Sequence, residues 1–334
     1  MQKGRCLIIA EAGVNHNGSL DNAYKLCDIA KEAGADVVKF QTWITDNIIT
    51  KSVEQASYQK ENTRRDESQY EMLKRLELGK EDFRKIKEHC DSIGITFAST
   101  ADDEESLDFL ISLGIPFIKI GSGDILNVPF LEYIGSKNMP VILSTGMSSI
   151  QDVELSLNAL RCKGEPQVTL LHCTTDYPCN NSDVNLLAMQ TLEERFKVDI
   201  GYSDHTEGHR AAVAAVSLGA RVIEKHFTID KNMEGPDHKA SLNPEELREY
   251  ISEIRKTEEL LGNGEKKPTE NEIIISEVVI KRIVAKRKIE KGTVISEDVL
   301  TVKRNDRGLK ASMWKQILGT IAIRDFNEDE GLEM

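Results

Sequence analysis

Eight short apolar runs constrain the fold of this 334-residue chain more than any other feature. They recur through the first two thirds of the chain, and most end in a polar or glycine-bearing cluster. Because the runs are continuously apolar rather than alternating, they predict strands buried on both faces, as in a parallel sheet. The runs are CLIIAEAG (6–13), DVVKFQT (36–42), ITFAST (95–100), FIKIGSG (117–123), VILSTG (141–146), VTLLHC (168–173), DIGYSDH (199–205) and RVIEKHFT (221–228).

Amphipathic helical patterns fill most of the gaps between these runs. Residues 20–35, 82–94 and 149–162 are examples, and several such patterns end in glycine, the usual residue at a helix C-cap. Eight strand–helix units within residues 1–262 predict an α/β fold of the (β/α)8 TIM barrel type. A doubly wound sheet is the alternative, and the even spacing of the runs favours closure.

The last part of the chain has a different character. Residues 263–278 begin with a polar stretch that contains glycine and proline, which predicts a linker. From residue 279 to 334, short strand-like runs and a Lys-Gly turn predict a small β-rich domain. Such a domain is too small to be very stable alone, so we expect it to dock on a barrel.

Composition excludes several kinds of partner. The 43 Lys and Arg against 56 Asp and Glu give a formal charge of −13, which argues against nucleic acid or an anionic membrane as a partner. The six cysteines form no CxxC motif and no dense framework, which is typical of reduced thiols. No apolar run approaches the roughly 18 residues of a spanning helix, and the start of the chain lacks a signal-peptide pattern. We expect a cytoplasmic protein.

Two histidines lie at the ends of neighbouring strands. The stretch 200–228 reads as strand, alanine-rich helix and strand, with His205 and His226 at or near the strand ends. Parallel neighbours place their carboxyl ends side by side, so both imidazoles would share one rim and could bind a divalent cation. Two structural histidines bonded to carbonyls are the alternative. The other polar residues at strand ends favour the metal.

Two lysines lie within apolar strands, where an unpaired ammonium group is costly. Lys39 and Lys119 could bind an anion together with nearby hydroxyls and glycine amides, or one could be a Schiff-base lysine. An ion pair with a strand-end carboxylate is the third interpretation. The hydroxyls of Thr100, Ser122 and Ser144 favour the anion. Glu11 could act as a base, and Asp237, on a Gly-Pro turn, could accept hydrogen bonds from a polyol.

Eight stretches of the chain carry a resemblance to a known family. In order, they are IIAEAGVNHNGSLDNA, VVKFQT, KIGSGD, ILSTGM, LLHCTTDYP, GYSDHT, EKHFTIDKNMEGPDHKASL and, near the C-terminus, IVAKRKIEKGTVISEDVLTVKR. The first seven resemble the sialic acid synthases, which condense phosphoenolpyruvate with an N-acylated mannosamine-type sugar. The last resembles that family's antifreeze-like SAF domain. The resemblance implies a barrel with a SAF domain in a domain-swapped homodimer.

The resemblance also implies roles for individual residues. His205 and His226 would bind a divalent metal, Mn²⁺ with Mg²⁺ or Co²⁺ as alternatives. The implied catalytic residues are Glu11, Glu224 and Lys119; the phosphoenolpyruvate contacts are Lys39, Thr100, Lys119, Ser122 and Ser144; and the acceptor-sugar contacts are Gln41, Asp124, Tyr177, Asp237 and Arg304. Arg304 would reach the partner's site from the SAF domain.

The first expectation for the activity is N-acetylneuraminate synthase. The alternative with the same chemistry is an N,N'-diacetyllegionaminate, pseudaminate, 9-phosphate or Kdn-type synthase; a Schiff-base aldolase and a sugar-binding protein are more distant. The chain has STADD at 99–103 where the family often has STPFD, Asp124 where bacterial members often have glutamate, and NDRGLKAS after VKR. These differences leave the acceptor sugar open.

Overall fold

The protein divides into two compact units, Met1–Asn263 and Gly264–Met334. The computed structural model describes residues 5–55, 60, 62, 63 and 65–334. Among the described residues, no helix is both long enough and apolar enough to cross a membrane.

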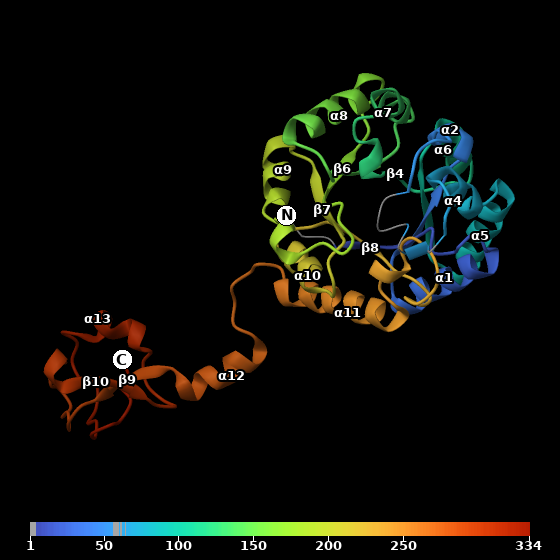
Figure 1. The fold of residues 1–334 in the computed structure, drawn as a ribbon. Coiled ribbons are helices and arrows are strands. Elements are labelled where there is room, and N and C mark those ends of the chain that lie inside the picture. The colour runs from blue at the N-terminus through green and yellow to red at the C-terminus, as the bar shows by residue number, and fades with distance from the viewer. Residues whose placement is uncertain (1–4, 56–59, 61, 64) are drawn as a thin grey trace. The chain divides into compact units, whose positions relative to one another are not determined.

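The first unit is a closed barrel of eight parallel strands, each paired with the next in sequence and β8 paired with β1 (Figure 1). The predicted TIM-like barrel is therefore confirmed. The strands are β1 Leu7–Gly13, β2 Val37–Thr42, β3 Thr96–Ala101, β4 Ile118–Ile120, β5 Val141–Ser144, β6 Val168–Cys173, β7 Asp199–Asp204 and β8 Val222–His226.

Helices surround the strands as the outer layer (Figure 1). The predicted glycine C-caps are present: Gly34 and Gly94 end α1 and α5 with φ of 87° and 72°, in the left-handed region that glycine tolerates. The helices of this unit are α1 Leu20–Ala33, α2 Thr45–Ile48, α4 Gln69–Leu76, α5 Lys80–Ile93, α6 Glu104–Ser112, α7 Val128–Gly135, α8 Ile150–Cys162, α9 Ala188–Phe196, α10 Arg210–Ser217 and α11 Pro244–Leu261.

The barrel interior changes from apolar to polar within two residues along the strands. Successive side chains of a strand alternate between its faces, so residues two apart share a face. The inner apolar layer consists of Leu7, Ile9, Val37, Ala98, Phe117, Ile142, Leu171 and Val222. Two positions beyond members of this layer come Glu11, Lys39, Thr100, Lys119, Ser144 and Glu224. The apolar floor therefore supports a polar layer at the carboxyl ends of the strands.

The second unit contains helix α12 Glu270–Val279, strands β9 Lys281–Ala285 and β10 Leu300–Arg304, and helix α13 Trp314–Ile317. The prediction of a linker over 263–278 was incomplete, because α12 fills most of it. A capping box between Thr269 and Glu272 starts this helix, a local signal that the polar composition obscured. The β content is one antiparallel pair plus isolated bridges, around a core that includes Ile283 and Phe326.

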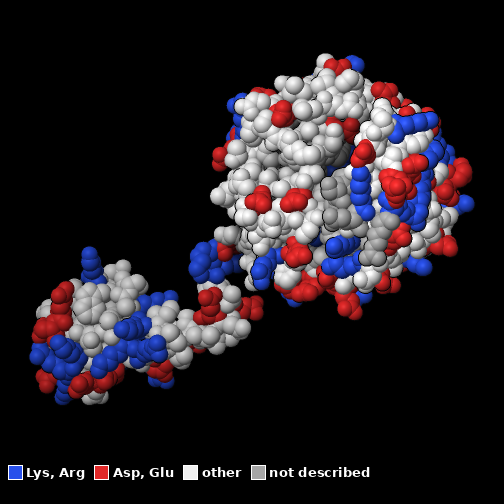
Figure 2. All heavy atoms as spheres, in the orientation of Figure 1, with Lys and Arg blue, Asp and Glu red and all other residues white. Residues whose placement is uncertain are grey.

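Charged side chains are unevenly spread on the face of the barrel shown in Figure 2. They gather on the side of α2 and α4–α6, whereas the surface over α7–α9 shows fewer (Figure 2). Lysine, arginine, aspartate and glutamate are interspersed on the second unit (Figure 2).

Candidate active site at the carboxyl ends of the barrel strands

One part of the polar layer is centred on Lys39 of β2. Its Nζ lies 2.6 Å from Glu11 Oε2 and 3.6 Å from Glu224 Oε2, and it donates a hydrogen bond of 2.9 Å to Thr100 Oγ1. The side chains of Lys39 and Glu11 are each 2% exposed. Of the interpretations of Lys39, the structure therefore shows the ion pair, in which carboxylates of β1 and β8 are the partners.

Lys119 of β4 makes a similar contact with the other carboxylate oxygen of Glu224. Its Nζ donates to Ser144 Oγ at 2.8 Å and lies 3.6 Å from Glu224 Oε1. Ser203, on β7, donates to the same Glu224 oxygen at 3.0 Å. Two ammonium groups thus lie near the two different oxygens of one buried carboxylate.

The pKa values of these groups follow from burial and from their charges. Burial raises the pKa of Glu11 to about 7, against the opposing effect of Lys39. Burial also acts to raise the pKa of Glu224, but Lys119 and Lys39 outweigh it and lower this pKa to about 2. Burial lowers the pKa of Lys119. Glu224 is therefore a fixed anion, whereas Glu11 can exchange a proton near neutral pH.

The histidine pair lies at the ends of β7 and β8, with ring centroids of His205 and His226 5.7 Å apart. His205 Nδ1 bonds to the carbonyl oxygen of Thr174 at 2.7 Å. Because a carbonyl only accepts, Nδ1 carries the proton and the lone pair of Nε2 is left for a ligand. His226 Nδ1 is buried and finds no hydrogen-bond partner within the described part of the chain. Burial lowers the pKa of both rings, which keeps them neutral.

These properties fit a divalent cation. Neutral imidazoles with free lone pairs are metal ligands, and an unpartnered buried nitrogen is otherwise costly. Within the residues that the structure describes, no group of three or more His, Cys, Asp or Glu side chains is arranged to hold a metal. A cation at this pair would therefore take its other ligands from water or substrate.

A small cavity opens beside the histidine pair. Tyr177 packs on His205 with ring centroids 4.1 Å apart. The cavity is lined by Asn62, Tyr177, Asp204, His205, His226, Pro236, Asp237 and Ala240. Burial raises the pKa of Asp237 to about 6. A neighbouring cavity is lined by Gln41, whose Nε2 donates to Glu11 Oε1 at 3.1 Å. Gln41 thus joins two parts of the site: the lysine part, which consists of Lys39, Lys119 and their partners, and the histidine part around His205 and His226.

Gly13 leaves room where the two parts meet. A Cβ on this residue would lie 3.4 Å from Glu11 Oε1, 3.5 Å from Gln41 Nε2 and 3.6 Å from His226 Cε1. Its φ of 52° also favours glycine. The space between Glu11, Gln41 and His226 is therefore open because residue 13 has no side chain.

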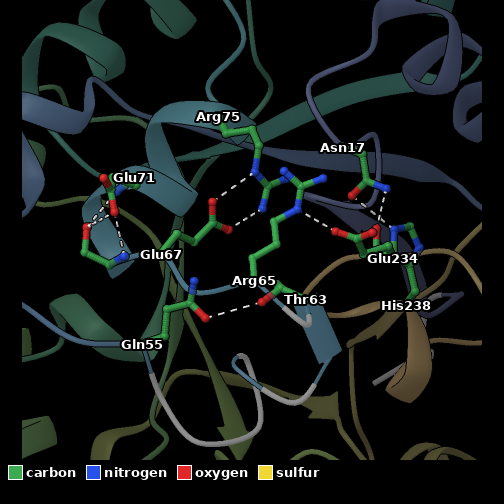
Figure 3. A network of polar contacts seen from close by, with 10 residues as sticks. Asn17, Gln55, Thr63, Arg65, Glu67, Glu71, Arg75, Glu234 and His238 are labelled. Carbon is green, nitrogen blue, oxygen red and sulfur yellow. Dashed lines mark hydrogen bonds and ion pairs between the residues drawn. The ribbon is translucent and has the colours of Figure 1, made fainter.

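The loop that carries Asp237 is held by contacts with segments after β1 and β2 (Figure 3). Arg65 Nε lies 2.5 Å from Glu234 Oε1, and Asn17 Nδ2 donates to the carbonyl oxygen of Glu234 at 2.8 Å. Asn62 Nδ2 donates to the Pro236 carbonyl oxygen at 2.8 Å. These contacts position the loop beside the cavity.

The structure brings most of the predicted site residues together in and beside the polar layer. Ser122 and Asp124 lie in a 3-10 turn after β4; Ser122 Oγ accepts from Gly146 N at 3.0 Å, and Asp124 accepts from Asn127 at 2.9 Å. Arg304 is exposed at the end of β10 in the second unit. Its contact with an acceptor sugar remains a prediction.

Two residues of the site were missed from sequence. Ser203 lies in β7, two positions before His205, so strand alternation could have placed it in the polar layer. Asn62 lines the cavity from an irregular segment after β2, where no periodic signal exists.

Comparison with known proteins agrees with this arrangement. The model of the NeuB family matches residues 26–266, and that of the SAF domain matches residues 281–333. The chain belongs to the NeuB family. The resemblance seen in the sequence is confirmed, including its SAF domain, and the homologous proteins named below are synthases.

Three relatives illustrate the range of similarity. The N,N'-diacetyllegionaminic acid synthase of Legionella pneumophila is 48% identical, with 94% of this chain and 90% of that protein covered. The enzyme of the same name from Campylobacter jejuni is also 48% identical, with 98% of each covered. A crystal structure of an N-acetylneuraminic acid synthetase from Leptospira borgpetersenii has a TM-score of 0.71 and 33% identity, with 83% of this chain and 93% of that chain covered.

Proposed function

We propose that this NeuB family member is an N,N'-diacetyllegionaminic acid synthase, which condenses phosphoenolpyruvate with a di-N-acetylated 6-deoxymannose-type sugar and releases phosphate. The observation that carries this proposal is the 48% identity, over nearly the whole chain, to two synthases of that name. Identity to the named N-acetylneuraminic acid synthetase is 33%. The comparisons therefore favour the alternative acceptor over the N-acetylneuraminate first expected from the sequence.

The lysine part of the polar layer suits phosphoenolpyruvate. This substrate carries a phosphate and a carboxylate, and Lys39 and Lys119 with the hydroxyls of Thr100 and Ser144 supply four donors within one buried layer. The glycine-bearing turn of Ser122 lies next to β5. Fixed donors in a site shielded from water stabilise anionic charge as it moves from the substrate to the leaving phosphate.

The histidine part suits the acceptor aldehyde. His205 and His226 would hold a divalent cation, with Mn²⁺ as the first expectation, and such a cation polarises a carbonyl oxygen. Tyr177, Gln41 and Asp237 surround the adjoining space and offer hydrogen bonds to the sugar.

Glu11 supplies the proton chemistry of the reaction. The alkene carbon of phosphoenolpyruvate forms the new C–C bond to the aldehyde carbon, and water adds to the adjoining carbon. Glu11, with a pKa raised to about 7, accepts the proton of that water. Phosphate leaves by cleavage of the bond between this carbon and the bridging oxygen, as the added hydroxyl loses its proton and becomes the keto oxygen. Of the two protons that the water gives up, one ends on the former aldehyde oxygen, which becomes a hydroxyl, and the other leaves with phosphate. Glu224 lies within ion-pair distance of both lysines and favours their charged forms.

The proposal includes a homodimer in which Arg304 serves the partner's site. Helix α12 supports an interface, because it leaves apolar side chains exposed: Ile273, Ile274, Ile275, Val278 and Val279. The molecular mass in solution tests this assembly, and a monomer at working concentration would remove Arg304 from the proposed acceptor site.

The decisive experiment measures phosphate release and product mass with phosphoenolpyruvate, Mn²⁺ and a panel of acceptors. We expect the diacetylated 6-deoxy sugar to react with the highest kcat/KM, ahead of N-acetylmannosamine and its 6-phosphate. A higher kcat/KM with N-acetylmannosamine would change the assigned acceptor sugar but leave the proposed reaction type unchanged. No phosphate release with any acceptor would overturn the proposed function.

A Schiff-base aldolase is the second candidate, because burial lowers the pKa of Lys119. Borohydride trapping with pyruvate distinguishes the two. We expect no adduct of increased mass, and a reduced adduct on Lys119 would favour the aldolase.

A further inference from the structure

A second pair of opposite charges is buried next to the histidine pair. Asp204 ends β7 and Lys225 lies in β8, and the two residues are directly opposite in the strand register. Lys225 Nζ lies 3.6 Å from Asp204 Oδ1, with side chains 2% and 0% exposed. Each residue immediately precedes one histidine of the pair in the sequence.

Thr206 and Tyr250 complete the hydrogen bonding of this ion pair. Asp204 Oδ1 accepts from Thr206 N at 2.8 Å and from Thr206 Oγ1 at 2.7 Å. Its Oδ2 accepts from the hydroxyl of Tyr250, on helix α11, at 2.9 Å. Lys225 Nζ donates to the carbonyl oxygen of Thr206. All four side chains are buried. We call these four residues the clamp.

The clamp encloses the backbone of His205 and joins it to His226. Asp204 precedes His205 and Thr206 follows it, so their hydrogen bonds fix the chain on both sides of that residue. Lys225 is bonded to Asp204 and Thr206 and immediately precedes His226 on β8, so the same contacts also restrain His226. The relative position of the two strand ends is therefore set by directional bonds from outside the histidine rings.

Stability alone is a poor explanation for such a buried ion pair. Desolvation of two charges offsets most of their attraction, and apolar replacements of similar volume are often neutral or stabilising. What apolar residues cannot supply is directional restraint. At the ends of β7 and β8, that restraint acts on the two imidazoles, whose ring centroids lie 5.7 Å apart.

We propose that Asp204, Thr206, Lys225 and Tyr250 are positioning residues that fix the spacing of His205 and His226 and thereby set the affinity of the site for a divalent cation. The inference rests on the proposed function, because it takes the two histidines as the metal ligands. It extends that function to residues outside the histidine pair, including one on a helix.

The test is a titration of the full-length protein with Mn²⁺ in the absence of substrates, with free Mn²⁺ measured by electron paramagnetic resonance. Tyr250→Phe removes one hydroxyl and keeps the ring, and we expect binding to weaken about 3–10-fold. Lys225→Met removes the charge and keeps the chain length, with an expected loss of about 10–100-fold. Tyr133→Phe is the matched control, because its hydroxyl also donates to an aspartate, Asp108, at 2.6 Å, but between α6 and α7.

A second readout separates positioning from a purely structural role. With rising Mn²⁺, kcat of Tyr250→Phe should return to within about twofold of wild type, while the Mn²⁺ concentration for half-maximal rate stays raised. Wild-type Mn²⁺ affinity in both variants would overturn the clamp and leave the proposed function standing. A wild-type protein that turns over without binding a divalent cation would overturn the clamp together with the metal assignment.

Discussion

The polar layer at the barrel mouth has two parts that are built in opposite ways. In the lysine part, Lys39 and Lys119 already have partners, because Glu11 and Glu224 lie within ion-pair distance of their ammonium groups. In the histidine part, only His205 has a ring hydrogen bond, and the buried Nδ1 of His226 has none among the described residues.

This difference indicates how each part is kept ready for its ligand. The lysine part balances its charges internally, so an anionic substrate must take over contacts that carboxylates hold in its absence. The histidine part keeps neutral nitrogens open, and its geometry is fixed by the backbone and by the clamp around Asp204. Changes in the first part should therefore disturb stability as well as binding, whereas changes in the second should act mainly on activity.

The largest effect is expected from His226→Ala. Removal of one of the two proposed metal ligands should reduce metal-dependent turnover by at least ~10³-fold, because polarisation of the acceptor carbonyl is worth several kcal/mol. His172→Asn is the matched control, since His172 also lies near a strand end but bonds to the carbonyl oxygen of Val184. Phosphate release with saturating Mn²⁺ measures both. Near-wild-type turnover of His226→Ala would remove the functional distinction between the two parts.

The next effect is a loss of stability in the lysine part. Lys39→Met leaves Glu11 and Glu224 buried without their shared cation and should cost roughly 3 kcal/mol in the free energy of unfolding. Lys119→Met should cost less, because Lys119 pairs with Glu224 alone and Lys39 remains beside that carboxylate. Chemical denaturation at pH 7.5 compares them.

A double variant shows whether the loss of stability in Lys39→Met comes from the carboxylate that is left buried without a cation. Lys39→Met combined with Glu11→Gln should be more stable than Lys39→Met alone, since one unpaired carboxylate is removed. Equal stability of the single and double variants would argue against an internally balanced lysine part.

The sequence identified the lysines of the lysine part but not their partners. Lys39 and Lys119 stood out because charges inside apolar strands are rare, and the strand period placed them on one rim. The sequence favoured an anion as their ligand, whereas the structure pairs both lysines with carboxylates. That pairing depends on the register between β1, β2 and β8, which brings Glu11 and Glu224 to Lys39.

The barrel itself was predictable because parallel strands buried on both faces leave continuous apolar runs. The clamp was not, because Tyr250 joins Asp204 from a helix 46 residues further along the chain. Helix α12 was missed for a different reason: its polar flank masked a local capping box.

A smaller effect concerns Asp102, just beyond β3 in the lysine part. Burial, and then Asp124, raise the pKa of this carboxyl to about 7. The folded protein thus holds this proton more tightly than the unfolded chain, and wild-type stability falls as pH rises from about 4 to about 7. Asp102→Asn should therefore gain stability relative to wild type, by ~2 kcal/mol above pH 7 and by little near pH 4.

Denaturation midpoints at pH 4.5 and pH 8 check the prediction for Asp102. Asp108→Asn is the contrasting control, because hydrogen bonds from Lys137 and Tyr133 lower the pKa of Asp108. That variant should lose stability relative to wild type as pH rises through about 4, where the wild-type carboxylate ionises. A pH-independent difference for Asp102→Asn would show that its carboxyl is not held protonated by the fold.

The smallest effect is expected at Gly13, where the two parts meet. Gly13→Ala should cost about 1 kcal/mol of stability, because an alanine at φ 52° is strained in the left-handed region. Its methyl would lie 3.4 Å from Glu11 Oε1 and 3.6 Å from His226 Cε1, so it should also raise the KM of the acceptor a few-fold. Gly114→Ala separates the two causes, since Gly114 has φ 78° but nothing within 4 Å of its added Cβ. Steady-state kinetics should show a raised acceptor KM for Gly13→Ala alone, because strain is common to both variants and the crowded space is not. An equal acceptor KM in Gly13→Ala and Gly114→Ala would mean that the acceptor does not use the space beside Gly13.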